Sequence, residues 1–139
     1  MKTPASTLCF MGALLFMFGL LTGFGIPTFR SPRIGLSAHL AAIESGLGLI
    51  AFGLLLPHLA LSFGWAEAIS HSLWISLYVL WIGLLVGAIY GTGRTLPMAG
   101  AGLAAKLWQE NIARTLISVG SLGSAGAVLA LLSQWRWSA

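Results

Sequence analysis

Charged residues are scarce in this sequence of 139 residues, which has seven Lys and Arg and three Asp and Glu. Charged side chains make up 7% of the chain and hydrophobic ones 58%, whereas about a quarter of a typical soluble domain is charged. So few polar groups cannot cover a folded surface in water, and the composition therefore excludes a soluble globular domain. It predicts a single integral membrane domain over residues 1–139.

Cysteines and metal-binding motifs are equally scarce. The single Cys9 cannot form an internal disulfide, and we expect it to pack as a small apolar residue. His39, His58 and His71 stand outside any CxxC, HExxH or Glu-x-x-His motif. A metal centre made from protein side chains alone is therefore not expected, and His58 and His71 are interpreted as polar residues at one membrane interface.

Four apolar segments are long enough to cross a bilayer. No Lys, Arg, Asp or Glu falls between Lys2 and Arg30, Glu44 and Glu67, Glu67 and Arg94, or Arg114 and Arg136. A span needs about 20 apolar residues in a helix, so the sequence predicts helices over about 6–26, 36–56, 70–90 and 112–133. The first apolar run is longer than the ~7–15 residues of a signal peptide. The predicted fold is an all-α bundle of four transmembrane helices.

The remaining charges differ between the two ends of the predicted bundle. The connections after the first and third helices are basic and carry Arg30, Arg33, Arg94 and Lys106. The opposite end has charges of both signs, at Lys2, Glu67 and Arg136. The positive-inside rule predicts these two connections in the cytoplasm and both termini outside. The net charge of +4 is then explained by topology, and no basic patch indicates nucleic-acid binding.

An internal repeat is also visible. A pentad, an Arg, a Pro and a hexad recur in the same order, as GLLTG and GLSAHL at Gly19–Gly23 and Gly35–Leu40, and as GLLVG and GLAAKL at Gly83–Gly87 and Gly102–Leu107. Two copies of a helix–basic loop–helix unit predict a parallel repeat about an axis near the membrane normal. In this alignment Lys106 corresponds to His39.

His39 is the most unusual residue of the predicted second helix. An ionisable side chain within a membrane is costly, which makes a functional role the default hypothesis. The alternative is an interfacial histidine bonded to water or to a carbonyl, because His39 lies only a few residues into the helix. Beside it, Ala38, Ala42 and Gly46 form a stripe of small residues. The stripe leaves room for another helix or for a porphyrin, whose usual axial ligand is histidine.

Two more polar residues follow on the same helix. Glu44 lies about 140° around the helix from His39, so the two do not share one face within a chain. Glu44 therefore needs a partner, either in a neighbouring subunit or among Arg33, Arg94 and Arg114. Both an interfacial ion pair and a role as catalytic acid or base remain open for it. Ser45 can bond to its own helix backbone.

Two connecting segments and a later tripeptide carry a family resemblance. RSPRIGLSAHL, YGTGRTLPMAGAG and WQE resemble the bacterial hydroxylaminobenzene mutases, which are small four-helix membrane proteins. The resemblance covers about 27–111, and the AHL segment is also similar to that of the distantly related styrene oxide isomerases. It implies an isomerase of the bacterial inner (cytoplasmic) membrane acting on a small hydrophobic aromatic substrate. The implied reaction converts an aryl hydroxylamine to an aminophenol, or an aryl epoxide to an aldehyde.

The resemblance also implies a cofactor and roles for individual residues. In the isomerase relatives the corresponding histidine is an axial ligand of haem b between the subunits of a trimer, which implies His39 as the iron ligand and a homotrimer. Ferric iron would act as a Lewis acid in a dry, apolar pocket. Tyr78 keeps the family's aromatic hydroxyl, and with Ser45 and Glu44 it is expected to position oxygen or move a proton.

Arginines near the predicted interface are candidates for the haem carboxylates. Arg33 and Arg94, together with Arg30, are expected to meet the propionates through their guanidinium groups. Their charge is equally explained by membrane topology.

The sequence departs from the family at two positions. Both relatives have an Asn six residues after the histidine, where this chain has Ser45, and the mutases have another Asn where this chain has Leu80. An Asn amide can hold a substrate oxygen, whereas Ser is shorter and Leu cannot form the bond. These departures concern the substrate more than the haem.

A rival interpretation is a non-enzymatic oligomeric membrane protein, such as a small transporter or a haem-carrying or assembly subunit. An enzyme needs an open iron position beside a pocket. A carrier would occupy both axial positions of the iron or bind no iron.

Overall fold

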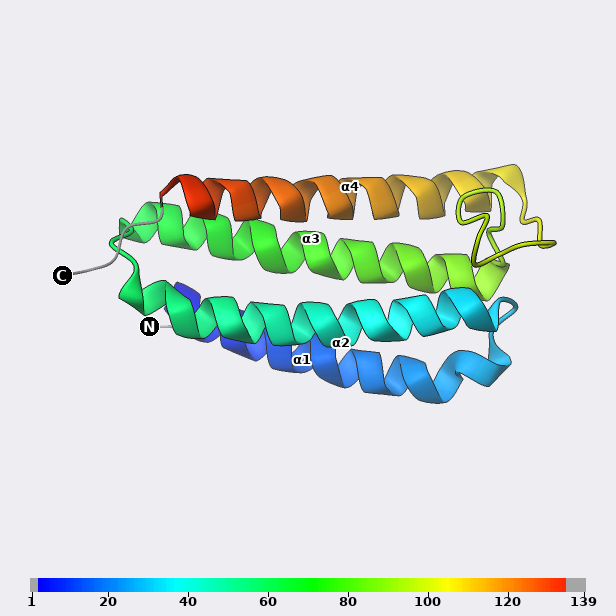
Figure 1. Ribbon diagram of the computed structural model, residues 1–139, viewed down its shortest axis with the longest axis horizontal. Helices are drawn as coiled ribbons and strands as arrows, with labels where there is room; N and C mark the ends of the chain where they lie inside the picture. Colours follow the sequence, from blue (N-terminus) through cyan, green and yellow to red (C-terminus); the bar gives the residue numbers. More distant parts are fainter. Residues whose placement is uncertain (1–2, 135–139) are drawn as a thin grey trace.

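The computed structural model describes residues 3–134 as a bundle of four long helices (Figure 1). These helices are α1 (Pro4–Gly25), α2 (Pro32–Leu55), α3 (Phe63–Tyr90) and α4 (Leu107–Ser133), and the 3₁₀ turns η1 (Ile26–Thr28) and η2 (Leu56–His58) extend the first two. Each long helix has the length and hydropathy needed to cross a membrane. The predicted all-α fold is confirmed, and the chain is a multi-pass membrane protein.

Every long helix begins earlier than predicted, and at α1 and α2 a polar cap rather than an apolar run sets the start. Thr3 caps α1 by accepting a hydrogen bond from the backbone N–H of Ser6, and Ser31 caps α2 by accepting from Ile34. A proline follows each cap at the first helical position. The polar first turns thus belong to the helices, and His39 lies about two turns inside α2.

The chain runs up and down through the bundle. The α1–α2 and α3–α4 pairs have the most extensive contacts, and the pairs meet mainly through α2 and α3. The connections after α1 and α3 lie at one end, which we call the loop end. The start of α1 and the end of α4 lie at the other, which we call the terminal end (Figure 1). Lys2 and Arg136, which entered the predicted orientation, lie outside the described residues.

Leucines and small residues fill the interior. Leu8, Leu15 and Leu49 are completely buried in one hydrophobic cluster. Between α1 and α2 the backbones touch: a Cβ at Gly12 would lie 2.6 Å from the carbonyl oxygen of Gly46. Close approach of this kind drives helix association in membranes, where lipid competes equally for apolar side chains.

The packing of the two helix pairs repeats, which supports the predicted two-unit organisation. Gly19 of α1 packs against Ile43 of α2, with a would-be Cβ 3.0 Å from the Ile43 backbone nitrogen. Gly83 of α3 packs in the same way against Ile117 of α4, at 2.9 Å. The GLLTG and GLLVG pentads are therefore equivalent in the structure.

The predicted equivalence of the two hexads, in contrast, is wrong. GLSAHL is helical within α2, whereas GLAAKL ends the long loop, with Gly102 at a φ of +81° and Lys106 capping α4. Counting one turn back from Ile43 and Ile117 makes Ala113, and not Lys106, the counterpart of His39. The two hexads are similar in sequence, but one lies within a helix and the other at the end of a loop.

Candidate functional site

His39 lies in the α1–α2 contact near the loop end. Its Nδ1 atom is 2.7 Å from the carbonyl oxygen of Gly19. Gly23, one turn further along α1, lies against the ring: a Cβ there would come within 2.8 Å of Nδ1 and 2.9 Å of Cε1. The two glycines of the GLLTG pentad thus form a seat for the imidazole, because the first supplies a carbonyl and the second leaves space.

The hydrogen bond to Gly19 determines what each ring nitrogen of His39 can do. A carbonyl oxygen only accepts, so the neutral imidazole carries its proton on Nδ1 and donates it to Gly19. Nε2 then keeps its lone pair. A histidine that donates one ring N–H to a backbone carbonyl and ligates through the other nitrogen is the usual arrangement at metal sites. The donor chemistry of His39 therefore fits the axial ligand of a haem.

The stripe of small residues beside His39 is covered by α1. Ala38, Ala42 and Gly46 are buried, and Gly46 approaches the backbone of Phe16. Of the two occupants that the sequence left open for this stripe, the structure shows another helix. The stripe itself offers no porphyrin pocket within one chain.

Tyr78 lies in the α1–α3 contact. Its hydroxyl donates to the carbonyl oxygen of Met11 at 2.9 Å, and its ring packs edge-on against Phe18. Trp81 stacks on the same Phe18 ring, and its Nε1 donates to Thr22 Oγ1 at 3.3 Å. The single O–H of Tyr78 donates its hydrogen bond to the Met11 carbonyl. In this arrangement the Tyr78 hydroxyl oxygen can therefore only accept a hydrogen bond from a further partner.

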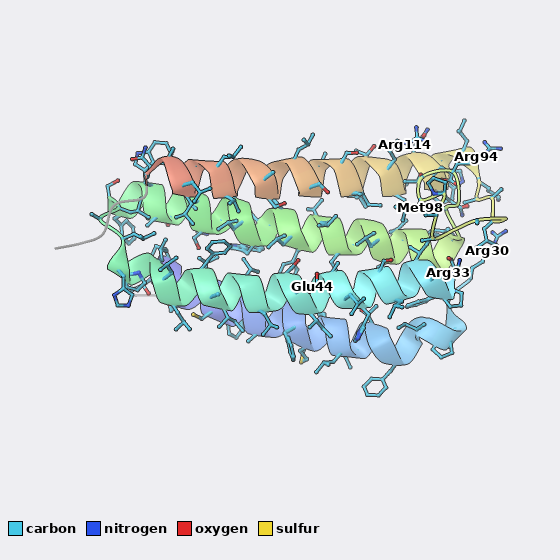
Figure 2. All side chains as sticks on the ribbon, viewed as in Figure 1. Arg30, Arg33, Glu44, Arg94, Met98 and Arg114 are labelled. Atoms are coloured by element: carbon cyan, nitrogen blue, oxygen red, sulfur yellow. The ribbon has the colours of Figure 1, made fainter. Side chains whose placement is uncertain are left out.

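Glu44 and Ser45 have different surroundings. Ser45 is half-buried, whereas Glu44 is exposed about midway along α2 (Figure 2). Within residues 3–134, Glu44 forms no ion pair with Arg33, Arg94 or Arg114. One chain thus gives His39 and Tyr78 separate partners and Glu44 no described ion-pair partner, and it does not gather the three around one described contact.

Arg30 joins the two connections at the loop end. Its guanidinium group donates to the carbonyl oxygens of Tyr90 at 3.3 Å and Ala104 at 3.2 Å. Arg33 and Arg94 are exposed at the same end of the bundle (Figure 2). The structure therefore separates a bridging arginine from two arginines whose charge faces outward.

Glu110 holds the long loop in place. Its side chain is completely buried, and its carboxylate accepts from the backbone N–H groups of Arg94, Thr95 and Ala105 at 2.9–3.4 Å and from the Thr95 hydroxyl at 2.7 Å. The sequence alone assigns Glu110 to the WQE motif and to an interfacial polar cluster at the start of the fourth helix, and this role is missed. The available signal was a carboxylate just after a glycine-rich loop, where free backbone N–H groups need acceptors.

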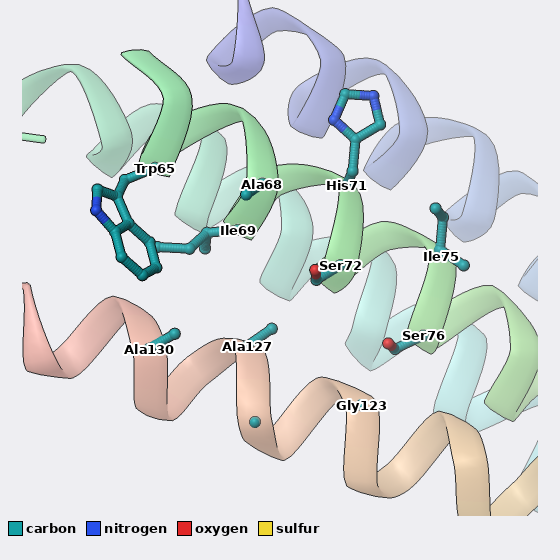
Figure 3. A pocket seen from close by; sticks show the side chains of 11 residues that line it. Trp65, Ala68, Ile69, His71, Ser72, Ile75, Ser76, Gly123, Ala127 and Ala130 are labelled. Carbon is teal, nitrogen blue, oxygen red and sulfur yellow. The ribbon is translucent and has the colours of Figure 1, made fainter. Parts of the chain in front are cut away.

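A groove of about 530 Å³ lies between α3 and α4 near the terminal end (Figure 3). Trp65 and His71 line it from α3, and Gly123 and Ala127 line it from α4. The His71 Nδ1 atom lies 2.9 Å from the carbonyl oxygen of Glu67, within its own helix. This groove lies at the opposite end of the bundle from His39, and is separate from the histidine seat.

These features define a class: a small all-α membrane protein with one histidine seated between two spanning helices. The sequence profile of the styrene oxide isomerase family matches residues 4–136. The chain belongs to this family and is an isomerase, which confirms the resemblance carried by its loops and decides against the non-enzymatic interpretation.

Two curated relatives are similar to this chain. Hydroxylaminobenzene mutase HabB of Ectopseudomonas oleovorans is 39% identical over 111 residues, covering 78% of this chain and 68% of the relative. Hydroxylaminobenzene mutase HabA of the same organism is 37% identical over 91 residues, covering 66% and 67%. No solved structure matches the chain.

Proposed function

We propose that the protein binds haem b through His39 and catalyses a redox-neutral rearrangement of a small aromatic substrate. The observation that carries the proposal is the bond between His39 Nδ1 and the Gly19 carbonyl, which leaves Nε2 ready to ligate. When bound, ferric haem supplies a Lewis acid for the substrate oxygen. The product is an isomer of the substrate, so the reaction needs no external oxidant or reductant.

The protein contributes orientation and a dry environment to this reaction. Gly19 holds the tautomer of His39, and Gly23 leaves the space that the ring occupies. The apolar bundle excludes water, which would otherwise trap a reactive intermediate. Tyr78 and Ser45 are proposed to orient the substrate oxygen or its hydrogen, and Glu44 is proposed to move a proton.

Arg33 and Arg94 are proposed to meet the haem propionates. Both are exposed at the loop end, which is also the end at which His39 lies. A guanidinium group can bind a carboxylate through two parallel hydrogen bonds. Arg30 is less available for this role because it donates to Tyr90 and Ala104.

An aryl hydroxylamine is the favoured substrate, rearranging to an aminophenol. The two curated relatives are named hydroxylaminobenzene mutases and are 39% and 37% identical to this chain. An aryl epoxide, rearranging to an aldehyde, is the second candidate, because the matching family profile is that of styrene oxide isomerase. Assays with one substrate of each class distinguish them.

We further propose a homotrimer in a bacterial inner membrane, with the loop end in the cytoplasm. The basic residues of the two loop-end connections support this orientation. An assembly of several chains would also bring the outward-facing Glu44 to another protein surface.

Visible absorption of the detergent-purified protein tests the haem proposal. Wild type is compared with His39→Ala, and a pyridine haemochrome assay identifies the macrocycle. We expect a Soret band that His39→Ala loses together with isomerase activity. The matched control is His71→Ala, which removes an exposed histidine from the terminal end and is expected to keep both. A fully active wild type without a Soret band would disprove the haem mechanism.

A further inference from the structure

Glu44 is a charged residue that lacks an electrostatic partner among residues 3–134 of its own chain. It is exposed about midway along a membrane-spanning helix, and no described residue pairs with it. Its neighbours on the same face of α2 include Leu40 and Leu47, which are 46% and 53% exposed. A carboxylate facing lipid at this depth is costly, and such residues normally face protein or a water-filled cavity. The outer face of α2 therefore needs a polar partner that one chain does not supply.

Arg114 presents the complementary problem on α4. It is exposed within a spanning helix, and it too lacks an ion pair among the described residues. Of the basic residues at 3–134, it is the one furthest inside a spanning helix from the loop end. Because α4 packs mainly against α3, much of its surface is left uncovered by its own chain. Figure 2 shows Glu44 and Arg114 on different helices of the bundle.

The depths of these two side chains are compatible with a pair between chains. Both α2 and α4 begin at the loop end, at Pro32 and Leu107. At a rise of about 1.5 Å per residue, Glu44 lies about 18 Å and Arg114 about 10 Å along its helix. Cyclic symmetry about the membrane normal keeps each residue at the same depth in every copy. The remaining offset of about 8 Å is within the combined length of the two side chains.

We infer that the outer face of α2 around Glu44 binds the α4 face of a second copy of this chain, where Glu44 pairs with Arg114 of the partner subunit. The contact joins two different faces, so it repeats around a ring instead of closing between two chains. The inference deepens the proposed homo-oligomer and rests on it, but it requires neither the haem nor the substrate. It gives Glu44 an assembly role at the edge of each chain, in addition to the proton transfer proposed above.

Charge reversal tests the pair in purified full-length protein. The molar mass in detergent is measured by light scattering for wild type, Glu44→Arg, Arg114→Glu and the double variant. We expect an oligomeric wild type, a fall toward the mass of one chain in each single variant, and recovery in Glu44→Arg with Arg114→Glu. Glu67→Arg is the matched control, because it reverses an exposed carboxylate at the terminal end and is expected to leave the mass unchanged.

Several outcomes would overturn the inference. A monomeric wild type would do so, as would single variants that keep the wild-type mass, or a double variant that does not recover. If the reversed variants do not accumulate, crosslinking with a short bismaleimide decides, because an offset of about 8 Å is too long for a direct disulfide. Chains with Cys9→Ala and Glu44→Cys are co-expressed with differently tagged chains carrying Cys9→Ala and Arg114→Cys. A mixed dimer is expected, and none is expected when Leu129→Cys replaces Arg114→Cys, because position 129 lies at a different depth on α4. An absent mixed dimer would contradict the pair.

The same samples separate this inference from the proposed function. An oligomer that obeys the charge-reversal pattern but carries no haem would support the interface and contradict the haem mechanism. A haem-loaded protein with isomerase activity and the mass of one chain would support the haem mechanism and contradict the interface.

Discussion

At the residue scale, two glycines on another helix determine the position and the hydrogen bonding of the His39 ring. The carbonyl oxygen of Gly19 accepts a hydrogen bond from Nδ1 at 2.7 Å, and Gly23 leaves open the volume beside the ring. Neither glycine is required by the backbone conformation there, since both lie inside α1. Their contribution is the absence of a side chain, which lets an imidazole lie directly on a helix backbone.

Gly23→Ala tests this seat. The added Cβ would lie 2.8 Å from Nδ1, so the ring must move and weaken its bond to Gly19. We expect a loss of about 1–3 kcal/mol in unfolding free energy from overpacking and the disturbed hydrogen bond, although Ala favours a helix by ~1 kcal/mol. Thermal unfolding in detergent measures the stability, and the Soret band of the proposed haem reports on its ligand.

The control for this experiment is Gly48→Ala in α2, where an added Cβ meets no atom within 4 Å beyond its chain neighbours and its own helix backbone. We expect unchanged or slightly higher stability and an unchanged spectrum. Equal behaviour of the two variants would show that Gly23 does not support the histidine.

At the element scale, the loop after α3 is organised by the helix that follows it. The Glu110 carboxylate accepts hydrogen bonds from both ends of this loop, at Thr95 and Ala105. Arg30 ties the same loop to the connection after α1 through the carbonyl oxygen of Ala104. The loop end is therefore one hydrogen-bonded unit, and its conformation depends on a buried acceptor.

Glu110→Gln is expected to loosen this unit. The amide keeps the shape of the carboxylate, but one of its two acceptor oxygens becomes an NH₂ group that faces N–H donors. Hydrogen bonds to a charged acceptor contribute about 1.5–3 kcal/mol each, so we expect a loss of about 2–3 kcal/mol in stability. Limited proteolysis of the loop and thermal unfolding measure the effect.

Glu67→Gln is the comparison for Glu110→Gln, because Glu67 is exposed near the start of α3. It is expected to change stability by less than about 0.5 kcal/mol. A Glu110→Gln protein with wild-type stability and an uncut loop would show that the carboxylate is not needed.

At the scale of the whole molecule, the up-and-down path puts the start of α1 and the end of α4 at one end and the basic connections at the other (Figure 1). Arg30, Arg33, Arg94 and Lys106 all belong to the loop end or the first turn beside it. Short loops rich in Lys and Arg stay in the cytoplasm. The bundle is therefore expected to insert with its histidine nearer the cytoplasmic side.

Reporter fusions test this orientation in cells. With alkaline phosphatase or green fluorescent protein fused to the C-terminus, we expect phosphatase activity and little fluorescence, because the first reporter folds outside and the second inside. Fusion after Gly100, in the loop after α3, is expected to give the opposite pattern. A fluorescent C-terminal fusion with an inactive phosphatase would contradict this orientation and indicate the opposite one.

The membrane class and the four helices were determined by the sequence itself, because an apolar run without charges is a local property that needs no other segment to recognise it. The His39 seat required the tertiary structure, since its acceptor, Gly19, comes from a different helix. Glu110 also required the tertiary structure, because its carboxylate is buried only where the N–H groups of the preceding loop surround it. The same is true of the hexads, since GLAAKL ends the loop before α4 although its letters match the helical GLSAHL. Local composition decides whether a segment spans, whereas partners distant in the chain decide what a polar residue does there.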